Sequence, residues 1–135
     1  MPSLRPEVAE RLQFLADQPF QEEWLNRDPL RFPRCYRRQE DVEVVAVLSA
    51  LLAYGRVELF GGVIEKILGQ MGESPGAYVR DFGAAEEAAL VPIFYRWNRH
   101  PDFALLFRTL QQVYREFPSL GAIFEGEGDP LEGAI

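Results

Sequence analysis

The sequence predicts an all-α protein. Strict alternation of apolar and polar residues is nearly absent, whereas apolar residues recur at steps of three and four along most of the chain. Residues 40–54 are apolar on nearly every side, which is typical of a helix at the centre of a domain. Proline and serine start signals stand between the apolar stretches. We therefore expect a compact bundle of about five or six helices around this buried central helix, as part of a larger helical fold.

The N-terminal residues are predicted to form one helix and a short amphipathic segment. The helix begins at Pro6, since proline is favoured in a first turn, and ends near Pro19. Residues 20–25 continue as the short amphipathic piece. Residues 28–33 are expected to form a loop, because each of their two prolines biases the preceding residue toward extended backbone.

The central helix, residues 40–54, has signals at both ends. Glu40, Asp41 and Glu43 lie in its first turn, where the helix dipole favours acidic side chains. Gly55 follows the helix and is expected to end it in a left-handed conformation.

The next helix is expected over residues 57–71, with Gly72 as its stop. Gly61 and Gly62 lie inside it and lower its helix propensity. We expect close packing against a neighbouring element to compensate for this.

Ser74 and Pro75 predict the start of a third helix, as an N-cap followed by a first-turn proline. This short helix is expected to close at Gly83. Residues 84–90 can add one or two further turns.

Residues 94–99 (FYRWNR) form an aromatic and basic connector. Pro101 and Asp102 then start a long amphipathic helix, which is expected to reach Phe117. Residues 120–124 are expected to form a last short turn.

The tail, residues 125–135, is separated from a single helical domain over residues 1–124. It begins as an acidic, glycine-rich loop, and residues 129–132 (DPLE) then read as a helix start. A helix of about one turn is not stable alone in water. We therefore expect a truncated helix that a C-terminal half or a partner chain completes.

Bulk composition limits the function. The formal charge is −7, so DNA binding would need a local basic patch. The single cysteine excludes an intramolecular disulfide, and no cofactor or metal site is expected. The chain shows no signal peptide and no apolar span, so we expect a cytoplasmic protein without a membrane partner.

One basic cluster precedes the central helix, and two interpretations of it stay open. It consists of Arg27, Arg31, Arg34, Arg37 and Arg38. These arginines can hold phosphates. They can equally form surface ion pairs with the acidic residues nearby in sequence, which contribute little stability.

The end of the central helix is the second candidate site. Tyr54 and Arg56 can present an aromatic ring and a cation to a ligand. The alternative is core packing for Tyr54 and a helix-end charge interaction for Arg56. His100, Lys66 and Cys35 lack the companions that a metal site or a nucleophile needs, so we expect no catalytic residue.

Three segments of the chain carry a family resemblance: RFPRCYRRQEDVEVVAVLSALLAYGRVELFGGVIEKIL, MGESPGAYV and FYRWNRHPDFALLFRTLQQVYREFPSLGAIF. Together they resemble the front half of an uncharacterised bacterial family of unknown function. Its marks are the basic lead-in, the acidic Asp-Val-Glu helix start and the Ala-Tyr-Gly-Arg exit. The likeness covers residues 27–124, with Trp97 where the pattern has phenylalanine.

That family is similar, more distantly, to helix-hairpin-helix DNA glycosylases of the endonuclease III type. In those enzymes the residues after the buried helix meet DNA near the extruded base. The hairpin, the catalytic lysine and the catalytic aspartate all come after the matched region, and this chain contains none of them. The resemblance implies that Arg96 and Asn98 lie close to Tyr54, Gly55 and Arg56.

We therefore expect the N-terminal helical portion of a DNA glycosylase-like, base-excision or DNA-binding protein that is catalytically incomplete by itself. The alternative is a helical protein–protein interaction module with no nucleic-acid role. The DNA hypothesis expects Arg37, Arg38 and Arg56 on one face. The candidate nucleic-acid-binding residues are Arg34, Arg37, Arg38, Tyr54, Gly55, Arg56, Arg96 and Asn98.

Overall fold

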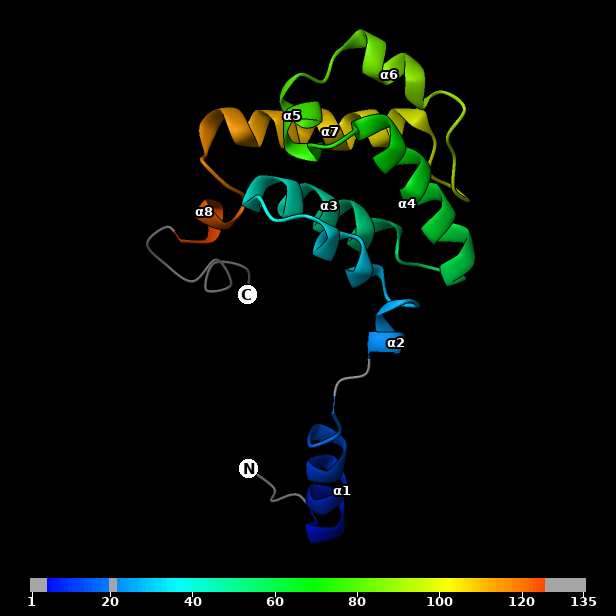
Figure 1. Ribbon diagram of the computed structural model, residues 1–135. Coiled ribbons are helices and arrows are strands. Elements are labelled where there is room, and N and C mark those ends of the chain that lie inside the picture. Colours follow the sequence, from blue (N-terminus) through cyan, green and yellow to red (C-terminus); the bar gives the residue numbers. More distant parts are fainter. Residues whose placement is uncertain (1–4, 20–21, 126–135) are drawn as a thin grey trace.

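The fold was obtained as a computed structural model, which describes residues 5–19 and 22–125 (Figure 1). The described residues form helices and one isolated bridge, and no strand, so the all-α prediction is confirmed. In chain order the elements are α1 (Pro6–Ala16), α2 (Glu22–Leu25), the 3-10 helices η1 (Pro29–Arg31) and η2 (Pro33–Cys35), α3 (Gln39–Leu52), α4 (Val57–Met71), α5 (Pro75–Arg80), α6 (Ala84–Leu90), α7 (His100–Glu116) and α8 (Gly121–Phe124).

The centre of the fold is the antiparallel pair α3 and α7 (Figure 1). At the start of α3, Glu43 accepts hydrogen bonds from the Tyr114 hydroxyl (3.1 Å) and from the Leu120 N–H (2.9 Å), which lie at and just beyond the end of α7. At the other end, the hydroxyl of Tyr54 donates to the side chain of Asn98, just before α7. Polar contacts therefore fix the register of the pair at both ends.

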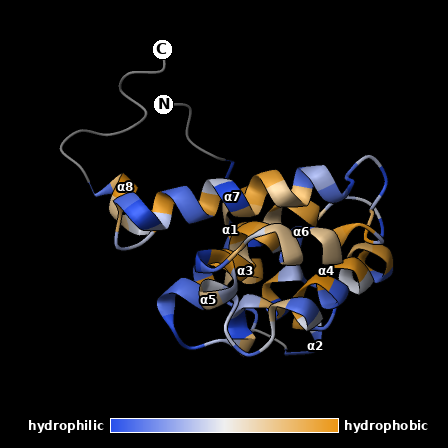
Figure 2. Cartoon of the chain, turned by 90° about the horizontal axis from the view of Figure 1, so that it is seen from above, coloured by the Kyte–Doolittle hydropathy of each residue, from blue (hydrophilic) through white to orange (hydrophobic). Residues whose placement is uncertain are grey.

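The core lies between α3, α4, α5 and α7. Leu48, Ile64, Ile67 and Phe107 are fully buried, and each such side chain contributes roughly 1.5–3 kcal/mol through the hydrophobic effect. Along α7, hydrophobic and hydrophilic residues alternate (Figure 2). The amphipathic pattern of α7 therefore matches a helix with one covered face.

One face of α3 is open to solvent, which corrects the prediction of a central helix buried on every side. Val44, Val45 and Leu48 are completely buried, yet Ala50 is exposed and Leu51 keeps 58% of its surface. The apolar pattern identified the right helix, but it could not tell which sides the other described helices cover.

The acidic first turn of α3 anchors α5. Asp41 is buried and accepts hydrogen bonds from the Ser74 hydroxyl (2.9 Å) and the Gly76 N–H (2.8 Å). Glu40 forms a two-pronged ion pair with Arg80 at the other end of α5. These carboxylates therefore hold the start of α3 against a helix more than thirty residues away in sequence.

The predicted helix ends are largely confirmed. Gly72 ends α4 with a positive φ of +70°, as expected. Helix α3 ends earlier than predicted, at Leu52 with Ala53 as its C-cap, so Gly55, with φ of +82°, lies beyond the helix end. Ser74 caps α5 by accepting a hydrogen bond from the Ala77 N–H. Residues 28–33 differ from the predicted loop, because Pro29 and Pro33 each start a 3-10 turn.

The two glycines inside α4 have different surroundings. A Cβ on Gly61 would lie 3.1 Å from an Arg31 side-chain nitrogen, so close packing accounts for this glycine. A Cβ on Gly62 would meet no atom within 4 Å. The packing expectation therefore holds for Gly61 and fails for Gly62.

Helix α1 contributes no buried side chain and lies apart from the other described helices (Figure 1). None of the helices described is long and apolar enough to cross a bilayer. The predicted helix start at residues 129–132 lies outside the described residues.

Candidate functional site

The candidate site lies where α3 ends against the connector that precedes α7. In this connector, Tyr95 and Asn98 exchange backbone hydrogen bonds of 2.9 and 2.8 Å and close a tight turn around Arg96 and Trp97. Arg96 has φ of +53° and is the only non-glycine residue with positive φ among those described. The turn therefore holds an arginine in a sparsely populated backbone conformation.

Tyr54 joins this turn to the end of α3. Its hydroxyl donates to Asn98 Oδ1 and lies 3.2 Å from the Tyr95 carbonyl oxygen, while the Tyr95 hydroxyl donates to the Tyr54 carbonyl oxygen. The two tyrosine rings pack with their centroids 4.9 Å apart. Burial raises the pKa of Tyr54 above its ordinary value of 10.0, so the hydroxyl stays a donor at neutral pH.

Gly55 allows this close approach. A Cβ at this position would lie 2.7 Å from the Tyr95 hydroxyl oxygen and 2.8 Å from an Arg96 guanidinium nitrogen. The Arg96 side chain therefore lies directly over the Gly55 backbone. Both the positive φ and the lack of space require glycine here.

The turn presents aromatic rings and cations in alternation. Trp97 keeps 80% of its surface and stacks at 16° on Tyr54, with 6.2 Å between the ring centroids. Phe94 is 61% exposed, and the Arg99 guanidinium lies 5.4 Å from the centre of its ring. Exposed aromatic faces beside arginines can stack on flat rings and neutralise negative charge.

The local charge is opposite in sign to that of the whole chain. The cationic side chains near the turn are Arg56, Lys66, Arg96 and Arg99, and the carboxylates are Glu58 and Asp102. The chain as a whole carries −7. Any attraction of an anion to this end of α3 is therefore local.

The structure brings together only part of the predicted set. Tyr54, Gly55, Arg96 and Asn98 are in contact, and Arg56 follows directly at the N-cap of α4. These five residues make one cluster at the end of α3.

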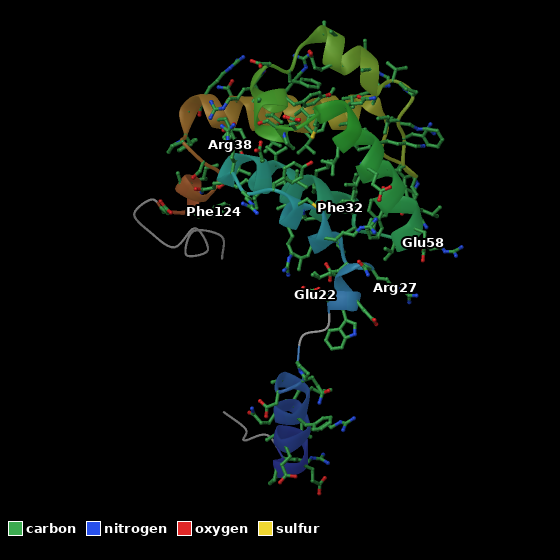
Figure 3. All side chains as sticks on the ribbon, in the orientation of Figure 1. Glu22, Arg27, Phe32, Arg38, Glu58 and Phe124 are labelled. Carbon is green, nitrogen blue, oxygen red and sulfur yellow. The ribbon has the colours of Figure 1, made fainter. Side chains whose placement is uncertain are left out.

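Arg37 and Arg38 lie elsewhere. They precede α3, whose 14 residues span roughly 21 Å, so they lie at the opposite end from Tyr54. In Figure 3, Arg38 lies at the left, at the start of α3, whereas Glu58, two residues after Arg56, lies at the right, on α4. Arg37 and Arg38 are therefore separated from Arg56 by the length of α3 and do not belong to the cluster around Tyr54.

Arg34 lies in a different environment again. It lines a hollow of about 460 Å³ together with Glu22, Glu23 and Arg31. Arg31 forms its ion pair with Glu65 of α4 at 3.0 Å. Among the described residues, the acidic neighbours Glu40 and Asp41 pair with α5 instead of with these arginines.

Sequence reasoning left three aromatic residues of the connector out of the candidate site. They are Phe94, Tyr95 and Trp97. Their signal was the alternation of aromatic and basic residues in FYRWNR, which indicates an exposed turn better than a packed helix. The contact with Tyr54 spans more than forty residues and had no local signal.

Other reactive side chains lie outside the cluster. Cys35 is exposed and donates a weak hydrogen bond from Sγ to the Arg31 carbonyl oxygen at 3.3 Å. Within residues 5–19 and 22–125, no three histidine, cysteine or carboxylate side chains gather in a way that could hold a metal ion.

Comparison with known proteins gives one match. Residues 28–134 match the model of a family described as a protein of unknown function (DUF2400). No curated protein and no solved structure matches the chain. The match confirms the resemblance to an uncharacterised family and extends it through most of the tail.

Proposed function

The chain belongs to the DUF2400 family of unknown function, and we propose that it is the DNA-binding helical portion of a glycosylase-like protein. The observation that carries the proposal is the exposed turn at residues 94–99, in which Trp97 stacks on Tyr54 beside Arg96 and Arg99. Proteins that bind single-stranded nucleic acid combine aromatic stacking surfaces with cations that meet the phosphates.

The proposed DNA surface is smaller than the sequence suggested. It consists of the Tyr54–Arg56 segment, the 94–99 turn and Lys66, and it omits the arginines before α3. Few phosphates can be contacted by so few cations, so we expect weak binding with a shallow salt dependence. No catalytic step is assigned to any described residue.

The test is a titration of a fluorescently labelled DNA strand, followed by anisotropy at several salt concentrations between about 50 and 200 mM. Arg96→Ala and Arg99→Ala should each weaken binding and reduce the salt slope by about 1 if the residue meets a phosphate. Arg115→Ala is the matched control, because Arg115 is exposed in the last turn of α7, far from the turn. Equal effects of all three variants, or no binding at the lowest salt, would overturn the proposal.

The second candidate function is a protein–protein interaction module. The open face of α3 favours it, because Leu51 keeps 58% of its surface there, and Leu30 of the neighbouring η1 also keeps 58%. A small apolar hollow of about 110 Å³ lies beside this face, between Leu30, Pro33 and Ala46. Leu51→Glu should abolish self-association or partner capture and leave DNA affinity unchanged, which separates the two functions.

A further inference from the structure

A hollow of about 410 Å³ lies between α4 and the segment Phe94–Arg96. Leu59 and Gly62 line it from α4, and Phe94 lines it from the connector. Leu59 and Phe94 are large apolar side chains that remain 52% and 61% exposed. An apolar hollow with one aromatic wall suits a flat ring.

Packing explains neither Gly62 nor Gly69 of α4, and of these two Gly62 is the one that lines the hollow. Glycine inside a helix lowers its stability relative to alanine, so it usually serves close packing or an unusual φ. Gly62 has neither, since a Cβ there would meet no atom within 4 Å and its φ is not positive. Its effect is to leave the floor of the hollow without a side chain.

The polar groups around the hollow are of two kinds. Lys66 and Arg96 supply positive charge, and Glu58 supplies a hydrogen-bond acceptor. Positive charge attracts a phosphate, and an acceptor can bind the N–H groups at the edge of a base. An apolar floor, an aromatic wall, two cations and one acceptor together match a nucleotide.

We propose that this hollow binds one unpaired nucleobase of a DNA strand, with the adjoining phosphate held by Lys66 and Arg96. The inference rests on the proposed function, which supplies the strand. A base paired within a duplex cannot enter a hollow of this kind without leaving its stack. Trp97 continues the surface beyond Arg96, where its open face can stack on the neighbouring base.

The first experiment fills the hollow without disturbing the fold. Gly62→Leu places a side chain on its floor, and Gly69→Leu is the matched control, because Gly69 lies in the same helix with no atom within 4 Å and outside the hollow. Gly62→Leu should weaken binding of an oligothymidine strand about tenfold, within the range that one stacked base contributes. Gly69→Leu should leave the affinity within about twofold. The melting temperature of both variants should be no lower than that of the wild type.

The second experiment separates bases from phosphates, using an abasic strand of equal length. It should bind more weakly than oligothymidine and be insensitive to Gly62→Leu. If both strands bind equally and Gly62→Leu changes neither, while Arg96→Ala weakens both, DNA binding stands and the nucleobase site is wrong.

Thymidine monophosphate is the third probe. It should displace oligothymidine from the wild-type protein and should no longer displace it from Gly62→Leu. If the monophosphate binds with the same sensitivity to Gly62→Leu but no strand binds, the hollow takes a free nucleotide, and both the strand and the proposed function are overturned.

Discussion

Tyr54 and Tyr95 each direct the side-chain hydroxyl to the backbone carbonyl oxygen of the other. The Tyr95 hydroxyl donates to the Tyr54 carbonyl oxygen, and the Tyr54 hydroxyl lies 3.2 Å from the Tyr95 carbonyl oxygen. Tyr54 ends α3 and Tyr95 begins the turn before α7, so this exchange ties the two central helices together. It also fixes the ring on which Trp97 stacks.

Tyr54→Phe removes the hydroxyl and should lower the free energy of unfolding by about 1–2 kcal/mol, because Asn98 loses its partner. Tyr78→Phe is the control, since the buried Tyr78 hydroxyl has no hydrogen-bond partner in the described part of the chain. It should leave stability unchanged or raise it. Urea denaturation of both variants measures the difference, and equal losses would contradict the assigned hydrogen bonds.

Arg96→Asn tests whether the strained turn serves binding. Asparagine tolerates positive φ better than arginine, which relieves about 1 kcal/mol of backbone strain. The lost cation–π contact with Tyr95, at 5.9 Å, offsets about 0.5 kcal/mol of this. The unfolding free energy should therefore stay level or rise slightly while DNA affinity falls. A clear loss of stability would instead give Arg96 a structural role.

The positions of helix ends could be predicted from the sequence, because capping is local. Gly72 ends α4 and Ser74 caps α5 at the expected places, and α3 ends at Leu52, two residues before its expected end.

The covered sides of the helices could not be predicted, because they depend on contacts distant in sequence. The apolar pattern of α3 did not reveal that Leu51 stays exposed. The arginines before α3 were grouped with Arg56 as candidate DNA-binding residues, yet the length of α3 separates them in space. Nothing local indicated that Asp41 would bind the start of α5.

Gly61→Ala and Gly62→Ala should change stability in opposite directions. At Gly61 the new methyl group would press on Arg31, which cannot easily move because it pairs with Glu65 and packs on Phe32 at 4.6 Å. We expect a loss of about 1–2 kcal/mol there. At Gly62 the methyl group enters open space, and the gain in helix propensity should add about 0.5–1 kcal/mol. Thermal melts of the two variants decide this, and a loss at both positions would refute the open surroundings of Gly62.

Asp41→Ala should lower the unfolding free energy by about 2–3 kcal/mol, because it leaves the buried Gly76 N–H without its acceptor. Ser74→Ala, which removes only the cap, should lower it by about 1 kcal/mol. Hydrogen exchange should show the larger loss of protection in α5 for Asp41→Ala. Equal effects would mean that Asp41 acts only through Ser74.

Glu43 should make stability fall in acid. Burial opposes its ionisation, but hydrogen bonds from the Leu120 N–H, Gln39, Tyr114 and the Gly121 N–H outweigh burial and hold its pKa below the ordinary 4.5. A carboxylate with a lowered pKa stabilises the fold above its unfolded pKa, and this contribution is lost as the pH falls through the folded pKa. Unfolding free energies should therefore decline below about pH 4.5.

The Glu43 contribution can be isolated with two variants. Glu43→Gln should be less stable than the wild type at neutral pH, and the gap should narrow as the pH falls below 4.5. Tyr114→Phe removes one donor, so it should move the Glu43 pKa upward, which a carbon-detected NMR titration measures directly. A constant gap between wild type and Glu43→Gln across the acid range would show that Glu43 contributes through packing alone. The polar contacts that fix the register of α3 and α7 would then be those around Tyr54, at the other end of the pair. These contacts contain no carboxylate among their hydrogen-bonding groups.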